Sequence, residues 1–404
     1  MRQENKRWLL NISFPSLSIG VYIVAIYLFD DSPKLFLIAN TVFTIMIIES
    51  LYGGWERFSK ISLPRGILLL YSMWIGMSII WAWDKSATLG DIKRQIIFTI
   101  LWLSIVNVFK WDENAVKNGF KWIMIAGVCL TCYLLLYYGP AMYIQAVFQG
   151  KRIGEEILQL NKLGMYTATS CIVAFNLYIE DKKTKYLFVF IFVLIAMIGS
   201  GSKRAFLMLG LSMVISLVLK IKNEDTKNRA IKIFTAIFAV YVIAMIVLKL
   251  NFFSGVLGRF QELFTILETG DTKFSRIRFI KYGLKSFREN PIVGLGSGNS
   301  HKVTLEAMGW ATYLHNNYLE QLVDLGIIGF FLYYGLYAIL LKSLFPVARK
   351  GSFCARIMII LLLSQLISDM AVTSYNLKLT YILFAIAISI IENSYQRGKS
   401  ENVR

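Results

Sequence analysis

Histidine is scarce in this chain, where only His301 and His315 occur among 404 residues. A neutral imidazole is the side chain best matched to accepting a proton near neutral pH, so either histidine could be a general base. Both lie in a polar stretch between two apolar runs, and a solvated histidine with no chemical role is the alternative interpretation. The pair nevertheless marks this stretch as a candidate catalytic segment.

Basic residues form three further groups between apolar runs. They are Lys151 with Arg152, Lys203 with Arg204, and, in the long polar stretch, Arg259, Arg276, Arg278, Lys281, Lys285 and Arg288. Guanidinium groups bind phosphate through paired hydrogen bonds, so an anionic ligand would account for all three groups. For the last four of these residues, the alternative is contact with lipid phosphates at the membrane surface.

A glycine-rich stretch, GLGSGN from Gly294 to Asn299, precedes both histidines. Such a stretch can cradle a phosphate, but a nucleotide-binding fingerprint requires a strand before it and a helix after it. Here it follows Pro291 and a basic amphipathic helix predicted over residues 274–290, and a second helix is predicted over 258–268. The apolar face of the helix over 274–290 is expected to contain Ile277, Ile280, Leu284 and Phe287. We interpret the glycine-rich stretch as a tight turn.

The elements that position these residues are predicted to be membrane helices. The chain is 56% hydrophobic and 17% charged, with a mean hydropathy of +0.57, which exceeds what a soluble core requires. Membrane-spanning runs are expected near residues 8–29, 34–51, 63–83, 95–109, 119–139, 163–179, 185–200, 204–221, 230–250, 321–345, 355–369 and 376–391. The fold class is therefore all-α, a single transmembrane domain over 1–404 with about 12 helices. One large loop, 251–320, separates the ninth helix from the tenth.

The distribution of charge predicts the orientation of these helices. The connections at 30–34 and 84–90 carry only Lys34 and Lys85 as cations, whereas the alternate connections and both tails are richer in lysine and arginine. By the positive-inside rule, both termini are cytoplasmic and the loop 251–320 is extracytoplasmic. The net charge of +18 follows from this topology, and no soluble basic domain indicates nucleic acid binding. The first helix is expected to be retained rather than cleaved as a signal peptide.

The string HNNYLEQLVDLGIIG, from His315 to Gly329, is the most specific pattern in the chain. It resembles the O-antigen ligase and Wzy polymerase superfamily of GT-C-like membrane glycosyltransferases, which has a similar H-N-x-Y-L segment and an H-x(10)-G spacing ending here at Gly326. In that superfamily an arginine usually lies fifteen residues before a proline and a glycine turn, as Arg276 lies before Pro291.

The resemblance extends to other segments, over roughly residues 150–390. Arg152 is similar to the family's arginine in an earlier outer loop, and GSGSKRAF from Gly199 to Phe206 resembles a family segment that ends in Arg-Ala, which places Arg204 at a helix mouth. Asp369, in ISDM, resembles an acidic residue of a late outer loop. The family often shows R-x(3)-L at the helix mouth, where this chain has Met208, whereas Arg259 begins such a string in the long loop.

The resemblance implies transfer of a glycan from an undecaprenyl diphosphate carrier to an acceptor sugar at the outer face of a bacterial cytoplasmic membrane, with no metal, nucleotide or cofactor. Arg152, Arg204 and Arg276 would bind the diphosphate, and His315 would take the proton from the acceptor hydroxyl, giving inversion. Glu320 and Asp324 could orient the imidazole or the acceptor, or could have structural roles at the helix entry. Arg259, Arg278, Asn316 and Asp369 are further supporting candidates.

The sequence leaves two choices open, transporter or enzyme, and polymerase or ligase. A polysaccharide transporter or flippase would also suit many helices and an outer basic patch, but the predicted spans are nearly free of the ionisable residues that transporters place at the midplane. Within the enzyme class, we favour a polymerase of O-antigen or capsule repeat units over a ligase that transfers the glycan to lipid A core or to protein. A flippase and a chain-length regulator are expected partners.

Overall fold

The computed structural model describes residues 14–33, 36–52, 62–109, 113–149, 151–220, 275–370 and 372–401. Regular structure in these residues is helical throughout, which confirms the all-α class. Four of the helical stretches are long and apolar enough to cross a membrane, namely Leu63–Ile80, Lys85–Phe109, Val116–Tyr138 and Asn317–Arg349. The chain is therefore a membrane protein. The number of about 12 spanning helices stays a prediction.

The helices follow the apolar runs of the sequence closely. In the first half they are α1 (Phe14–Phe29), α2 (Phe36–Tyr52), α3 (Leu63–Met77) with η2 (Ser78–Ile80), α4 (Lys85–Phe109), α5 (Glu113–Tyr138), α6 (Pro140–Phe148), α7 (Leu160–Asp181), α8 (Thr184–Ser200) and α9 (Lys203–Lys220). In the second half they are α12 (Ser275–Glu289), α13 (Ser300–Met308), α14 (Asn317–Arg349), α15 (Phe353–Asp369), η5 (Ser374–Asn376) and α16 (Lys378–Glu401). The predicted helices over 230–250 and 258–268 lie outside the described residues.

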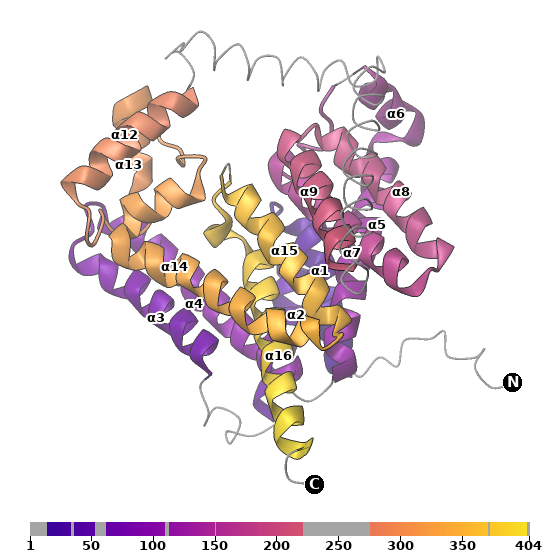
Figure 1. The fold of residues 1–404 in the computed structure, drawn as a ribbon. Helices are drawn as coiled ribbons and strands as arrows, with labels where there is room; N and C mark the ends of the chain where they lie inside the picture. Colours follow the sequence, from indigo (N-terminus) through magenta and orange to yellow (C-terminus); the bar gives the residue numbers. More distant parts are fainter. Residues whose placement is uncertain are drawn as a thin grey trace, which may run out of the picture.

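The helices pack into one bundle around a continuous apolar core. Helix α1 packs against α2 and α5, α7 against α8 and α9, and α14 against α3 and α15. Figure 1 shows α12 and α13 on one side, and α6 on the opposite side, of the end of the bundle that lies away from the C-terminal end of α16. The candidate site residues lie at this end.

Helix α4 is longer than its apolar run predicts. It begins at Lys85 rather than near residue 95, because Asp84 accepts hydrogen bonds from the backbone N–H groups of Ser86 (2.9 Å) and Ala87 (3.2 Å). Such capping satisfies amides that the first helical turn leaves unpaired. The polar residues of the first turns, including Asp91 and Arg94, hide this start from a hydropathy pattern.

Helix α14 is kinked at Gly326, where the backbone has φ 65° and ψ −168°. These angles are not helical, so Gly326 divides α14 into a short first part, residues 317–325, and a long apolar part, residues 327–349. The kink frees the carbonyls of Val323 and Asp324, which accept hydrogen bonds at 2.9 Å from the N–H groups of Leu295 and Gly296. A Cβ at Gly326 would lie 2.2 Å from the carbonyl oxygen of Ile292, so this close approach of two backbones requires glycine.

Helix α12 forms as predicted but packs through a different face. Phe279 is 2% exposed and Gly283 and Ser286 are also buried, whereas Ile280 and Leu284 are 45% and 40% exposed. Phe279 joins a small second core with Leu295, Val303, Leu314, Leu319 and Val323. Of the predicted apolar face, Phe287 packs partly against this core, whereas Ile280 and Leu284 lie on the outside of the helix, where lipid can cover them.

Candidate active site

His315 has an unusual backbone conformation two residues before α14 begins. Its φ is 55°, in the left-handed region that few residues other than glycine adopt. Its ring lies between two aromatic rings, with centroid distances of 3.9 Å to Tyr313 and 5.7 Å to Phe279. Strained backbone of this kind is concentrated at functional sites, where the surrounding structure holds it in place.

The neighbouring motif residues hold the His315 loop in position. The side-chain oxygen of Asn316 accepts a hydrogen bond from the N–H of Leu319 (3.1 Å) and so caps α14. The buried carboxylate of Glu320 accepts one from the N–H of Leu314 (2.9 Å), on the other side of the histidine. Asn316 and Glu320 therefore position His315, and the amino end of α14 adds a favourable field for an anion beside it.

Asp369 is fully buried between α14 and α15. Its carboxylate accepts hydrogen bonds from Asn317 Nδ2 (3.2 Å), the hydroxyl of Tyr334 (3.1 Å) and Gln365 Nε2 (3.4 Å). These bonds join the start of α14 to the end of α15. The structure therefore places Asp369 behind the His315 loop, as a residue that fixes where α14 begins.

Asp324 holds the glycine-rich turn. Its carboxylate accepts hydrogen bonds from the backbone N–H groups of Gly298 (3.1 Å) and Ser300 (2.6 Å), and its side chain is buried. The three glycines of the turn all have positive φ, from 71° at Gly294 to 97° at Gly296. The tight-turn interpretation is confirmed, because two of the N–H groups that a phosphate would need are already bound by the protein's own carboxylate.

Arg152 and Arg204 lie at one junction between helices. Arg152 Nε donates to the carbonyl of Ser200 (2.8 Å), the last residue of α8, and Arg204 is the second residue of α9. This junction is linked to the histidine loop, because Gln159 Nε2 donates to the hydroxyl of Tyr313 at 3.3 Å. Two segments that are far apart in the sequence, one with Arg152 and one with His315, thus meet at the same end of the bundle.

The three remaining arginine candidates are described less completely. Arg276 is the second residue of α12, one turn before Phe279, and its side chain lies outside the described residues, as does all of Arg259. Arg278 is described and is exposed. The placement of α12 against α14 brings the backbone of Arg276 to the His315 side of the bundle.

Comparison with known families bears on this arrangement. Residues 188–334 match the O-antigen ligase family. The matched stretch contains Arg204, Arg276, His315 and Gly326, so the resemblance inferred from the motif is confirmed there. No curated protein matches the chain significantly. As a broad class, the O-antigen ligase match supports a membrane enzyme that transfers glycans.

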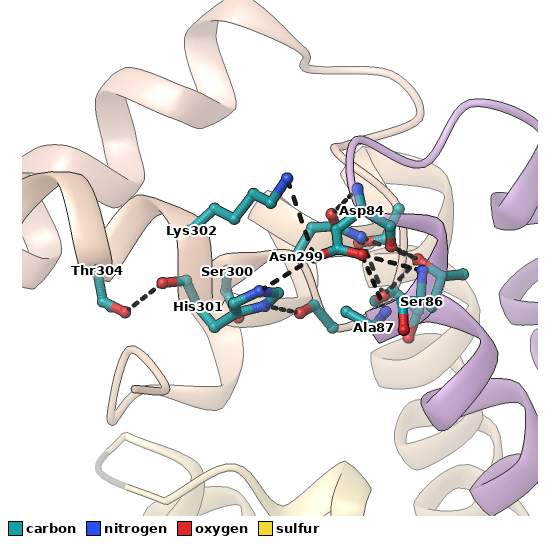
Figure 2. Close-up of polar contacts among 12 residues, drawn as sticks. Asp84, Ser86, Ala87, Asn299, Ser300, His301, Lys302 and Thr304 are labelled. Carbon is teal, nitrogen blue, oxygen red and sulfur yellow. Dashed lines mark hydrogen bonds and ion pairs between the residues drawn. The ribbon is translucent and has the colours of Figure 1, made fainter. Parts of the chain in front are cut away.

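His301, the other histidine of the segment that matches the O-antigen ligase family, is held in a different way, as Figure 2 shows. His301 Nδ1 donates to the carbonyl of Gly298, and Nε2 lies 3.7 Å from Asp84 Oδ2. Lys302 Nζ lies 3.9 Å from the same oxygen. Hydrogen bonds from the N–H groups of Ala87 and Ser86, with the charges of Lys302 and His301, lower the pKa of Asp84 below its usual 3.8 against the opposing effect of burial.

The Asp84–His301 pair was not predicted from the sequence. The only local signal was a capping pattern, an aspartate followed by Ser86 and Ala87 ahead of an apolar run. The pair joins the start of α4 to α13, and Asn299 strengthens the joint by accepting a hydrogen bond from the N–H of Asp84 (2.5 Å). The structure thus assigns His301 to a joint between helices rather than to the aromatic pocket of His315.

A cavity of about 700 Å³ lies beside the His315 loop. Tyr313 and Gln159 belong to its lining, together with residues from the turn between α1 and α2, from α4, and from the segment before α16. One of them, Asp30, accepts hydrogen bonds from Lys378 Nζ (2.6 Å) and Lys162 Nζ (3.4 Å). Burial raises the pKa of Asp30, but Lys378 and Lys162 outweigh it, so the pKa lies below the usual 3.8.

Proposed function

We propose that this protein is a glycosyltransferase that moves a glycan from an undecaprenyl diphosphate carrier to an acceptor sugar, at the outer face of a bacterial cytoplasmic membrane. One observation carries the proposal. The histidine of the O-antigen ligase motif is held in a left-handed conformation between two aromatic rings, beside the amino end of α14 and a cavity of about 700 Å³.

His315 is the general base of the proposed reaction. Its imidazole takes the proton of an acceptor hydroxyl while the hydroxyl oxygen attacks the anomeric carbon of the donor sugar. The bond from that carbon to the diphosphate oxygen breaks as the new glycosidic bond forms on the opposite face. The configuration at the anomeric carbon inverts, and the proton remains on the imidazole until solvent removes it.

Arginine side chains stabilise the leaving diphosphate. Negative charge grows on its oxygens as the bond to the sugar breaks, and fixed cations aimed at that charge lower the barrier. Arg152 and Arg204 share the junction between α8 and α9, and Arg276 is the second residue of α12. In this proposal the guanidinium groups take the place that a divalent metal has in other transferases, so the reaction requires no metal.

The acceptor distinguishes two versions of the function. A polymerase adds the glycan to another carrier-linked repeat unit, and we favour it because it needs no outer-membrane acceptor. A ligase transfers the glycan to lipid A core, and the description of the matched family as O-antigen ligase supports this second candidate. Both use the same donor and the same base.

The test offers a labelled undecaprenyl diphosphate glycan to the purified full chain in lipid nanodiscs, alone and with lipid A core, and sizes the products. A ladder on the carrier supports a polymerase, and transfer only to core supports a ligase. His315→Ala is the matched variant, with His301→Ala as its control. Wild-type rates in His315→Ala would refute His315 as the base, and no transfer by the wild type to either acceptor would refute the function.

A further inference from the structure

The cavity beside the His315 loop is built from four separated parts of the chain and from a fifth, Tyr313, which lies before α14. The turn between α1 and α2 and the first turns of α2 supply one wall, α4 the second, the start of α7 the third, and the segment before α16 the fourth. Its volume lies within the range of about 300–1,000 Å³ that is usual for small-molecule sites. Because Tyr313 is part of the lining, the cavity reaches the ring that contacts His315.

The polar part of the lining offers both donors and acceptors. Asp31 accepts hydrogen bonds from Lys162 Nζ (2.5 Å) and from the N–H of Gln159 (2.8 Å), and it keeps 30% of its side chain exposed. Arg94 donates to Asn376 Oδ1 (2.6 Å) while 42% of its side chain stays exposed. A ligand with many hydroxyl groups, each of which donates and accepts, matches such a mixed lining.

The charges in the lining nearly balance. The lining contains three cations, Arg94, Lys162 and Lys378, and two carboxylates, Asp30 and Asp31. Lys162 and Lys378 both contact Asp30. Arg94 also lies 3.1 Å from Asp91, a further carboxylate behind the lining. A diphosphate would place its negative charge near Asp30 and Asp31, which costs energy, whereas uncharged hydroxyls can bind to carboxylates and to cations alike.

The apolar part of the lining includes the rings of Phe36, Phe98 and Tyr313. A pyranose ring has faces of C–H groups and edges of hydroxyls, so it fits a cavity that combines aromatic rings with amides and charged groups. Asn40 and Asn376 supply the amides. The chemistry of the lining is that of a site for a sugar.

We propose that this cavity binds the acceptor glycan, as a short oligosaccharide without net charge, with its nucleophilic hydroxyl at the Tyr313 end. The inference rests on the proposed function in one respect, since the bound glycan is the acceptor only if His315 is the base. The end of the cavity near His315 is the one that gives this base access to the attacking oxygen. The donor diphosphate binds on the other side of Gln159, at the junction that contains Arg152 and Arg204. Tyr313 then contacts both the bound acceptor and the base.

The first experiment measures binding directly and requires no turnover. Saturation-transfer NMR is recorded on the full chain in nanodiscs with neutral hexose and N-acetylhexosamine oligosaccharides of two to four sugars, and with matched oligosaccharides that contain uronic acids. Asn40→Trp places a large side chain in the cavity. Thr41→Trp is the control, because it makes the same change at the next residue of α2. Thr41 is exposed and is not part of the cavity lining.

The expected result is a signal for at least one neutral oligosaccharide that Asn40→Trp removes and Thr41→Trp retains. Asp31→Asn removes one charge but keeps an acceptor for the N–H of Gln159, and it is expected to weaken binding about tenfold, the change that about 1.4 kcal/mol produces. If no neutral oligosaccharide binds, or if Asn40→Trp leaves binding unchanged, the inference is overturned. It is also overturned if only the uronic acid series binds.

The second experiment separates the acceptor from the donor. In the transfer assay, Asn40→Trp is expected to raise KM for the acceptor at least about tenfold, while the affinity for farnesyl diphosphate, a soluble donor analogue, stays unchanged. Loss of farnesyl diphosphate binding with intact oligosaccharide binding would assign the cavity to the donor and overturn the inference. Failure of the proposed function would appear elsewhere, as full transfer by His315→Ala, and would leave the measured oligosaccharide site in place.

Discussion

The two histidines of this chain lie in one polar segment, yet the structure treats them differently. Nδ1 of His301 donates to the carbonyl of Gly298, and Nε2 lies near the carboxylate of Asp84. These contacts join α13 to the start of α4. His315 lies between two aromatic rings in a left-handed backbone conformation, beside a large cavity. The difference teaches that residue type alone does not identify the base: the surroundings do.

The strongest test of this difference replaces each histidine with alanine in a separate variant. His315→Ala is expected to lower the transfer rate by about 10²–10⁴-fold, the usual contribution of a positioned general base. His301→Ala is expected to affect the unfolding midpoint more than the rate, because it removes a contact between α13 and α4. Rates are measured under single turnover and midpoints by size-exclusion chromatography after heating. Equal loss of rate in both variants would contradict the assignment.

The kink at Gly326, which packs against the turn that precedes His301, provides the next largest effect. Gly326→Ala forces a side chain to within 2.2 Å of the Ile292 carbonyl at a left-handed position, so we expect a loss of stability above about 3 kcal/mol. Gly335→Ala is the matched control in the same helix, where a Cβ meets nothing within 4 Å, and it should change stability by less than about 1 kcal/mol. The recovered fraction of folded protein and its unfolding midpoint report the difference.

A contrary result at Gly326 would be informative in itself. If Gly326→Ala folded like Gly335→Ala, the segment 291–296 would not depend on the kink, and the turn that holds His301 could move independently of α14. The glycine of the motif would then require a role other than the close approach of two backbones.

The cap of α14 sharpens the assignment of the residues around His315. Asn316→Ala is expected to cost about 1 kcal/mol of stability, and Asn316→Ser should recover most of it, because serine also caps helices. Ser352→Ala removes the equivalent cap of α15, where the serine accepts a hydrogen bond from the N–H of Ala355 (3.3 Å), and is the control for stability. If Asn316→Ser is stable but transfers no glycan, Asn316 contacts substrate and is more than a cap.

Much of the fold follows from the sequence because a lipid environment enforces long apolar runs. Helices α2, α8, α9 and α15 begin and end within two residues of the predicted limits. The start of α4 was missed, since its first turns are polar and are held by Asp84, and the short helices α6 and α13 have no long apolar run to mark them. The burial of Phe279 in α12 was not predicted, because the periodicity of apolar side chains does not distinguish a lipid-facing surface from a buried one.

The candidate site was predicted in its parts but not in its arrangement. The motif string singled out His315, Asn316, Glu320 and Gly326, and the structure adds a structural cause to each of the last three. The pairing of Asp84 with His301, and of Asp30 with Lys378, joins residues that no local spacing connects. Such contacts depend on how helices pack, which a single sequence does not display.

The smallest expected effect concerns the charge of Asp84 in the His301 region. Its pKa in the folded protein lies below the usual 3.8, so its contribution to stability is complete above that pH and is lost as the pH falls through the lower, folded-state value. Asp84→Asn keeps an oxygen for the N–H groups of Ser86 and Ala87 but removes the charge near His301 and Lys302. The unfolding midpoints of wild type and variant should therefore differ slightly at about pH 6 and converge as the pH falls below 3.8. A difference that persisted at the lower pH would show that the charge is not what joins α13 to α4, and the two histidine regions would then differ in packing alone.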